Sequence, residues 1–212
     1  MQLSISSMMR LSESASLLAR KQRNIRINTR TMLYELPKSA IIGGKKYSIR
    51  SDFRPALDIL ICLTDPELSP MERTMVSMDI FYPEMSSIPQ EDLQSACDYM
   101  VWFLNCGDEC DNRKRPKLMD WEQDFQYIVA PINKVVGSEI RALDYLHWWT
   151  FVSAYYEIGD CLFAQIVRIR QLKSKGRKLD KADQEFYREY KHLVDIKVKY
   201  TEADEAAINK WI

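Results

Sequence analysis

The spacing of apolar and polar residues between residues 120 and 170 predicts three consecutive helices. In the first helix, apolar side chains recur every three to four residues, which places them on one helical face. These positions are Trp121, Phe125, Ile128, Ile132 and Val136. Asp120 with Gln123 indicates a capping box at the start, and Gly137 is placed to end the helix in a left-handed conformation. We expect this region to form the core around which the other helices pack.

The next two helices follow from the same spacing. Asp144 is the candidate N-cap of the second helix, and Gly159 is its expected end. The buried face of the second helix is expected to comprise Tyr145, Trp149, Val152 and Tyr156. Asp160 is expected to open the third helix, whose inward positions are Leu162, Phe163, Ile166 and Ile169. Each large side chain buried in this way contributes about 1.5–3 kcal/mol.

Upstream of this region the sequence predicts a hairpin. Gly43 and Gly44 separate two short β-prone runs, and glycine tolerates the positive φ that both central positions of a two-residue hairpin turn require. A two-stranded hairpin is marginal alone in water, so we expect it to pack against the helices.

Three further helices are predicted between the hairpin and residue 107. Ser51 and Asp52 start the first of them, and Pro89 opens the third, which Gly107 ends. The second has the clearest start in the chain, with Ser69 as N-cap, proline next and Glu72 three residues on. The apolar face of the third comprises Leu93, Ala96, Cys97, Met100, Val101 and Leu104.

The C-terminal part adds one helix of ordinary length and one short helix. Asp180 and Asp183 stand where acids stabilise a helix N-terminus, and that helix is expected to continue through Val194. Thr201 can cap a last short helix containing Ala207 and Trp211. The predicted fold class is mainly α: a compact multi-helix domain of about seven or eight helices with one short N-terminal β-hairpin. We expect a single helical domain over residues 32–195 and a C-terminal tail over residues 196–212.

Residues 1–31 differ in composition from the rest of the chain. They contain six basic residues and one acid, Glu13, together with many serines. Three interpretations compete: an organelle transit peptide, a basic arm for nucleic acid, and a disordered extension upstream of a natural start at Met32. We favour the third, because basic tails are usually solvated. Leu11, Leu17 and Leu18 allow a short helix within this segment.

The whole-chain composition excludes several classes of function. The formal net charge is +0, so no global field favours DNA or a membrane surface. No run of 18 apolar residues exists to span a bilayer. The odd count of five cysteines fits free thiols in a reducing cytoplasm better than a disulfide scaffold.

Few residues have the spacing that a metal, phosphate-binding or catalytic site requires. Cys106 and Cys110 resemble half of a zinc site, but no second Cys/His pair is spaced to complete it, so we expect no metal. GGK at residues 43–45 lacks the remainder of a phosphate loop. We expect no cofactor, and no catalytic residue is proposed, so the chain is not expected to be an enzyme.

Three other groups of residues have both structural and functional interpretations. His147, in an aromatic pentapeptide, is expected to be a core histidine bonded to a carbonyl, because a catalytic one would need a bonded nucleophile or carboxylate. Arg168 and Arg170 are expected to end the third central helix and favour its C-terminus, with a phosphate contact as the alternative. The methionines near residue 75 are core filler or an adaptable surface for a partner helix. The candidate partner-binding residues are Met71, Met75 and Met78.

Several of these motifs together resemble the bacteriophage gene-product-fifteen family of Gram-positive phages and prophages. The residues that carry the resemblance are WEQD at 121–124, LHWWTF at 146–151, Ile166-x-x-Ile169-Arg170, Leu36-Pro37, GGKKYSI at 43–49 and SDFR at 51–54. The most specific element is LHWWTF, and the likeness covers residues 32–193. The signature and core residues are Trp121, Asp124, Leu146, His147, Trp148, Trp149, Phe151 and Arg170.

The resemblance implies a function as well as a fold. Members of that family are small, mostly helical proteins encoded near phage tail genes, and they are interpreted as tail assembly chaperones. The chain would then bind the tape-measure protein, or other phage tail proteins, in the host bacterial cytoplasm, without a cofactor; a homo-oligomer is compatible with this role. One alternative is a structural or tail-completion component of the virion. A weaker alternative is a nucleic-acid-binding module that uses residues 20–30 and the basic loop at residues 113–117.

Overall fold

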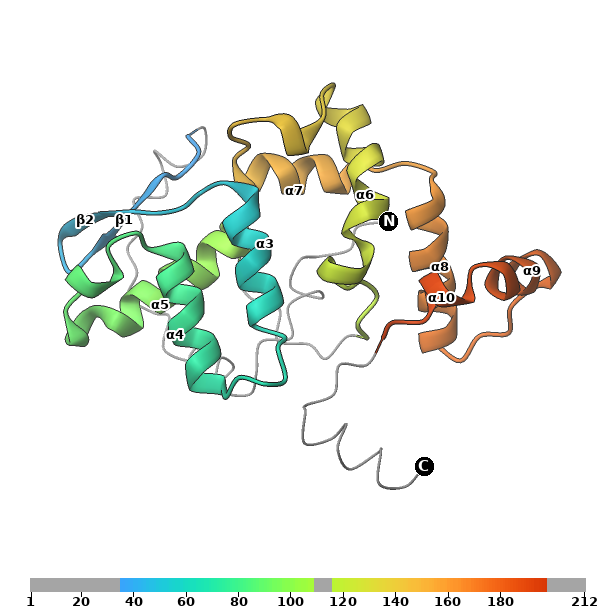
Figure 1. Cartoon of the computed structure of the whole chain (residues 1–212), viewed down its shortest axis with the longest axis horizontal. Coiled ribbons are helices and arrows are strands. Elements are labelled where there is room, and N and C mark those ends of the chain that lie inside the picture. Colours follow the sequence, from blue (N-terminus) through green and yellow to red (C-terminus); the bar gives the residue numbers. More distant parts are fainter. Residues whose placement is uncertain (1–34, 109–115, 198–212) are drawn as a thin grey trace. The chain divides into compact units, whose positions relative to one another are not determined.

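The computed structural model describes residues 35–108 and 116–197 (Figure 1). The predictions for residues 1–31, for Cys110, for most of the basic loop at 113–117 and for a helix after Thr201 lie outside these ranges. The described residues form eight α-helices and one two-stranded antiparallel sheet, which confirms the mainly helical fold with its N-terminal hairpin. None of the described helices has the length and apolar character needed to cross a membrane.

The described residues fall into two compact units. The N-terminal unit contains residues 35–108 and 147–149, and the C-terminal unit contains residues 116–146 and 150–197. Two such units can belong to one domain, so the single domain over 32–195 stays a prediction. Each unit is described by itself below.

The N-terminal unit begins with the expected hairpin. Strands β1 (Ser39–Ile42) and β2 (Lys45–Ser48) pair antiparallel, with Ile42 opposite Lys45. Gly43 and Gly44 have φ of 55° and 79°, as the two-residue turn requires. A Cβ on Gly43 would also lie 2.3 Å from an Asp92 carboxylate oxygen. The hairpin does lean on a helix, since the Tyr99 hydroxyl donates to the Ser39 carbonyl at 2.9 Å.

Three α-helices complete this unit: α3 (Phe53–Cys62), α4 (Pro70–Phe81) and α5 (Leu93–Leu104). Two 3₁₀ turns, η2 (Met85–Ser87) and η3 (Gln90–Asp92), connect α4 to α5. Two of the three predicted starts are confirmed: Asp52 caps α3, and Ser69 forms a reciprocal capping box with Glu72 at α4. The third is wrong, because Pro89 precedes the 3₁₀ turn η3 and α5 begins only at Leu93. The buried face of α5 is rotated from the prediction, because Phe103 and Tyr99 are buried while Leu93 and Val101 are only half-buried.

The C-terminal unit contains α6 (Trp121–Val136), the 3₁₀ turn η4 (Ile140–Ala142), most of α7 (Trp148–Tyr156), α8 (Leu162–Ser174), α9 (Lys181–Glu189) and α10 (Lys191–Val194). Both predicted ends of α6 are confirmed: Asp120 accepts from the Gln123 N–H, and Gly137 has φ of 80°. The reciprocal bond of the capping box was misassigned, because the Asp124 carboxylate, not Gln123, accepts from the Asp120 N–H.

The predicted start and buried face of α7 are wrong. The helix begins at Trp148, so Asp144 does not cap it, and it ends at Tyr156, before Gly159. Tyr145 and Tyr156 are 44% and 40% exposed, and Trp149 is only half-buried. The buried side chains of α7 are Trp148, Phe151, Val152, Ala154 and Tyr155. The cause is a backbone bridge between His147 and Asp52, which keeps His147 out of the helix.

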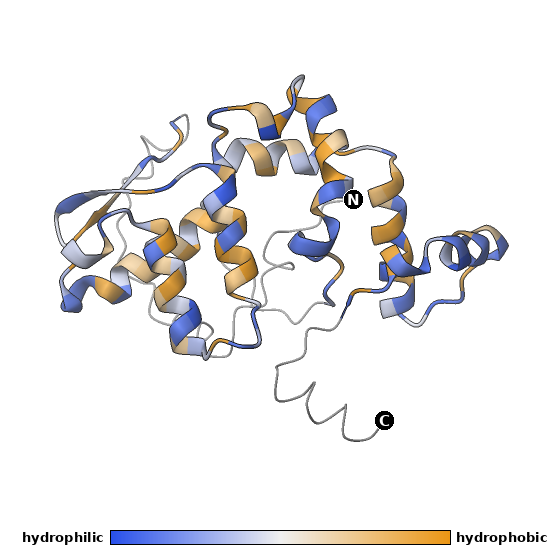
Figure 2. Ribbon diagram, viewed as in Figure 1, coloured by the Kyte–Doolittle hydropathy of each residue, from blue (hydrophilic) through white to orange (hydrophobic). Residues whose placement is uncertain are grey.

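Three smaller corrections concern the last helices. Cys161, not Asp160, caps α8, because its Sγ accepts from the Ala164 N–H at 3.4 Å. Leu162 is 38% exposed, so it does not point inward. The helix from residue 181 breaks at Tyr190 into α9 and α10. In Figure 2 most of α9 is hydrophilic, whereas α8 bears apolar residues that form a small core with α10: Ile166, Ile169, Leu193 and Val194.

Candidate functional site

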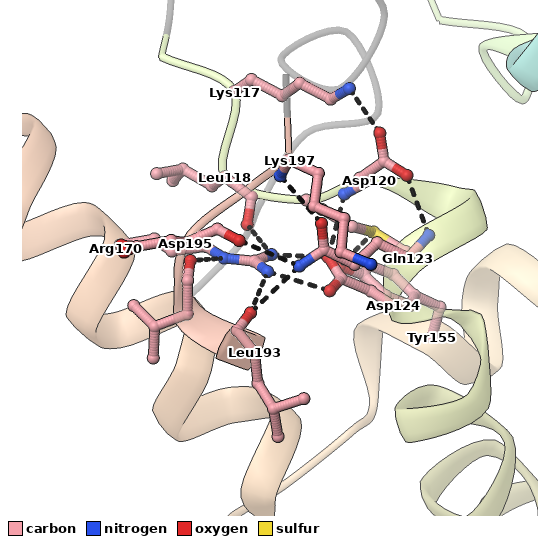
Figure 3. Close-up of polar contacts among 12 residues, drawn as sticks. Lys117, Leu118, Asp120, Gln123, Asp124, Tyr155, Arg170, Leu193, Asp195 and Lys197 are labelled. Carbon is pink, nitrogen blue, oxygen red and sulfur yellow. Dashed lines mark hydrogen bonds and ion pairs between the residues drawn. The ribbon is translucent and has the colours of Figure 1, made fainter. Parts of the chain in front are cut away.

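A buried arginine organises the polar interior of the C-terminal unit (Figure 3). Arg170 was expected near the end of its helix, but α8 continues to Ser174 and places the guanidinium inside the unit. Its side chain is 4% exposed, and that of Asp124 is 1% exposed. Two parallel bonds join them: Nη1 to Asp124 Oδ2 at 2.5 Å and Nη2 to Asp124 Oδ1 at 2.9 Å. This fork-to-fork geometry is the strongest form of an arginine–carboxylate contact.

The other donors of Arg170 bind main-chain carbonyls. Nε donates to Val194 at 2.7 Å, Nη2 to Leu193 at 2.6 Å and Nη1 to Leu118 at 3.1 Å. Five bonds match the five N–H groups of a guanidinium. Arg170 therefore ties the start of α6 to the end of α10, and no donor is left for an external phosphate. The phosphate alternative for Arg170 is not supported by this geometry.

Gln123, the residue before Asp124 in α6, binds the same C-terminal segment. Its Nε2 donates to the Leu193 and Asp195 carbonyls at 3.3 and 3.1 Å, and its Oε1 accepts from the Lys197 N–H at 3.0 Å. The Asp195 carboxylate accepts in turn from Lys173 at 2.6 Å and from the Tyr187 hydroxyl. Residues 193–197 are thus fixed mainly through their backbone, and we call this arrangement the clasp: Gln123, Asp124 and Arg170 with residues 193–197.

Arg168 behaves differently from its neighbour two residues on. It pairs with Asp183 at the start of α9 and its side chain is 51% exposed. The Asp183 side chain is 5% exposed, so only the arginine end of the pair is in contact with water, which screens the interaction in part. The two arginines that looked equivalent in the sequence therefore have distinct roles.

Three further signature residues, His147, Trp148 and Trp149, belong to the N-terminal unit. His147 is 2% exposed; its Nε2 lies 2.9 Å from the Pro37 carbonyl, and its Nδ1 accepts from the Trp149 N–H at 3.1 Å. Nε2 must carry the proton, because a carbonyl only accepts and Nδ1 already accepts. This confirms the expected hydrogen bond to a carbonyl and shows that the imidazole stands in for an N-cap of α7.

Two tryptophans follow His147 and bind the end of α5. Trp148 is fully buried and its Nε1 donates to the Leu104 carbonyl at 3.0 Å. Trp149 Nε1 donates to the Phe103 carbonyl at 2.8 Å, and its ring lies 5.4 Å from that of Trp102. The indole N–H groups thus bind two of the last carbonyls of α5, and the Phe103 carbonyl also accepts from the Cys106 N–H at 3.0 Å. The tryptophan pair is structural in this arrangement.

His147 gives the protein a specific pH dependence. Burial is the main cause that lowers the pKa of His147 below its ordinary 6.5, and a proton on Nδ1 would also remove the bond from Trp149. The unfolded chain then binds the proton more readily, so we expect stability to fall as pH drops below 6.5 and to level off below the folded pKa. Urea unfolding between about pH 8 and about pH 5 measures this.

The control for this prediction is the second histidine. His147→Gln should flatten the pH dependence, whereas His192→Gln should leave it unchanged, because His192 is exposed on α10. Equal pH dependence in wild type and His147→Gln would contradict the assignment.

The candidate methionines separate into two environments. Met71 and Met75 are 76% and 41% exposed on α4, whereas Met78 is 2% exposed in the core. Val76, also 41% exposed, joins the first two on the surface. Of the three candidates, Met71 and Met75 can therefore offer their side chains to a partner, and their role in binding stays a prediction.

The described residues offer little support for a metal site or a reactive thiol. No group of three or more His, Cys, Asp or Glu side chains there could hold a metal ion. Burial raises the pKa of the Cys106 thiol to about 12, which disfavours the thiolate that metals and electrophiles require. Cys110 lies outside the described residues.

Sequence reasoning missed the clasp, although one signal was present. Arg170 follows the apolar positions Ile166 and Ile169, and Asp124 lies between Trp121 and Ile128 on the apolar face of α6. A charged residue within a buried apolar stripe needs a partner of opposite charge. The stripe of α8 contains the base Arg170 and the stripe of α6 contains the acid Asp124, so the sequence already indicated that these two residues could pair.

Comparison with known proteins identifies a phage family. The family model described as "Bacteriophage Gp15 protein" matches residues 32–196, which include every signature residue discussed above. Comparisons with curated proteins and with solved structures gave no significant match.

Proposed function

The chain belongs to the bacteriophage Gp15 protein family, and from that premise we propose that it is a phage tail assembly factor. More specifically, we propose a chaperone that binds the tape-measure protein in the host cytoplasm while the tail is built. The proposal needs no cofactor and no catalysis.

One surface of the described structure supports a binding role. The residues of α4 that are exposed after its first position are Met71, Glu72, Met75, Val76 and Asp79. We call this set the α4 face. It contains three apolar and two acidic side chains and no base. Methionine side chains adapt to irregular apolar partners, so such a face suits the apolar stripe of a partner helix.

The proposed mechanism is temporary burial of apolar helix surface. A long helical tape-measure protein exposes apolar stripes before the tail tube encloses it. Packing these stripes on the α4 face would remove them from water and so prevent self-association. The contact must remain reversible, and a small face of five residues is compatible with a transient interface.

The test is co-expression with the tape-measure protein of the same genome, followed by affinity capture and sizing. We expect soluble co-purification from cells in which the tape-measure protein alone is insoluble. Met71→Ser combined with Met75→Ser should abolish capture, because it removes two of the three apolar side chains of the face, including the most exposed one.

The matched control is Ile41→Ser. Ile41 is 73% exposed on β1 of the same unit, so its replacement removes an exposed apolar side chain that does not belong to α4. Finding the protein at stoichiometric copy number in purified virions would contradict the chaperone role and favour a structural or tail-completion component.

A further inference from the structure

Charge is distributed unevenly along a chain whose formal net charge is +0. Residues 55–81, which cover most of α3 and all of α4, contain five acids and a single base, Arg73. Residues 1–31 contain six bases and one acid. Two segments of opposite charge within one chain attract each other when the chain can bring them together.

The α4 face presents the acidic charge next to apolar surface. Glu72 and Asp79 are exposed among Met71, Met75 and Val76. Hydrogen bonds from Ser69 lower the pKa of Glu72, so this carboxylate stays ionised at neutral pH. The only base on α4, Arg73, is half-buried and lies outside the face, and Arg50 binds the Asp79 and Ile80 carbonyls at the C-terminal end of α4. An occupant of this face should therefore combine basic and apolar side chains.

We propose that residues 1–31 of the same chain dock on the α4 face. This segment has the required composition, because it contains both its six bases and the apolar residues Leu11, Leu17, Leu18, Ile25 and Ile27. Length also permits it: a chain of 31 residues reaches up to about 100 Å, well beyond the size of a unit of this length. Its C-terminal end joins the N-terminal unit at β1, the unit that also contains α4.

The docking would regulate the binding proposed above. Residues 1–31 lie outside the family match, which begins at residue 32. A segment that occupies the α4 face competes with any partner helix for it, so the chain would bind its partner only when the segment is displaced. This regulatory consequence rests on the proposed function, whereas the docking itself does not and is tested without a partner.

The first test is limited trypsin cleavage of the full chain, which carries six basic cleavage positions within residues 1–31. Cleavage follows the undocked population, so Met71→Ser/Met75→Ser/Asp79→Asn should be cut there about tenfold faster than wild type. Glu72 is left intact because its carboxylate accepts from the Ser69 N–H in the capping box of α4. Ile41→Ser should be cut at the wild-type rate, and about 1 M salt should accelerate cleavage of wild type.

The second test observes the face directly by methyl NMR of the methionines. Arg20→Glu/Lys21→Glu/Arg23→Glu should shift the Met71 and Met75 methyl resonances and leave that of Met119, buried in the C-terminal unit, unchanged. Unchanged resonances together with equal cleavage rates would overturn the proposal. Protection that grows with protein concentration would also overturn it, because the occupant would then be a second copy.

Discussion

Replacing Arg170 with methionine is expected to lower the free energy of unfolding of the C-terminal unit by about 3–5 kcal/mol. The substitution keeps the length and apolar stem of the side chain but removes all five hydrogen bonds. Asp124, whose side chain is 1% exposed, would be left as a buried carboxylate without its cation. The carbonyls of Leu193 and Val194 would lose their donor as well. Urea unfolding followed by circular dichroism measures the loss.

Two variants show whether the loss comes from the buried pair. Arg168→Met removes the half-exposed arginine of the same helix, which makes two bonds to Asp183 where Arg170 makes five bonds, so it should cost less stability than Arg170→Met. Asp124→Leu combined with Arg170→Met should be more stable than Arg170→Met alone, because no buried charge is left unpaired. Equal losses for Arg168→Met and Arg170→Met would contradict the clasp. Amide exchange at residues 193–197 should accelerate in Arg170→Met and not in Arg168→Met.

The helix starts that could be predicted depend on neighbouring residues. Ser69 and Glu72 are three residues apart, and each binds the backbone of the other, so the sequence contains the whole motif. The same is true of Asp120 with the Gln123 N–H and of the two glycines of the hairpin. Local motifs of this kind determine where most elements begin and end.

The buried face of α7 could not be predicted in this way. Its start depends on the Trp148 N–H donating to the Ser51 carbonyl and on His147 contacting Pro37, which is 110 residues away. Apolar spacing alone allowed a helix that began at Tyr145, one turn too early. A distant backbone contact therefore decided which of two adjacent tryptophans enters the core.

The candidate binding residues and the clasp could likewise be predicted only in part. The methionines near residue 75 were recognised as a cluster, but the phase of α4 decides that Met78 is buried while Met71 and Met75 are exposed. Asp124 and Arg170 were both identified as signature residues, yet they are 46 residues apart and their pairing depends on how α6 packs on α8. The family resemblance identified both residues, and packing determined that they pair.

The last prediction follows from the choice between the two tryptophans. Trp148→Ala is expected to lower the free energy of unfolding of the N-terminal unit by about 3–5 kcal/mol, the usual cost of truncating a fully buried aromatic side chain. Its ring is 0% exposed, and the Leu104 carbonyl would lose the indole donor. Denaturant unfolding followed by tryptophan fluorescence or circular dichroism measures the change.

Neighbouring substitutions provide a graded comparison for Trp148→Ala. Trp149→Ala should cost less, because the Trp149 ring is half-buried although its Nε1 binds the Phe103 carbonyl. Tyr145→Ala should be close to neutral, because that side chain is 44% exposed and precedes the helix. A helix that began at Tyr145 would reverse this order, since Tyr145 and Trp149 would then face the core. The order of the three losses therefore tests the start of α7 independently of their absolute size.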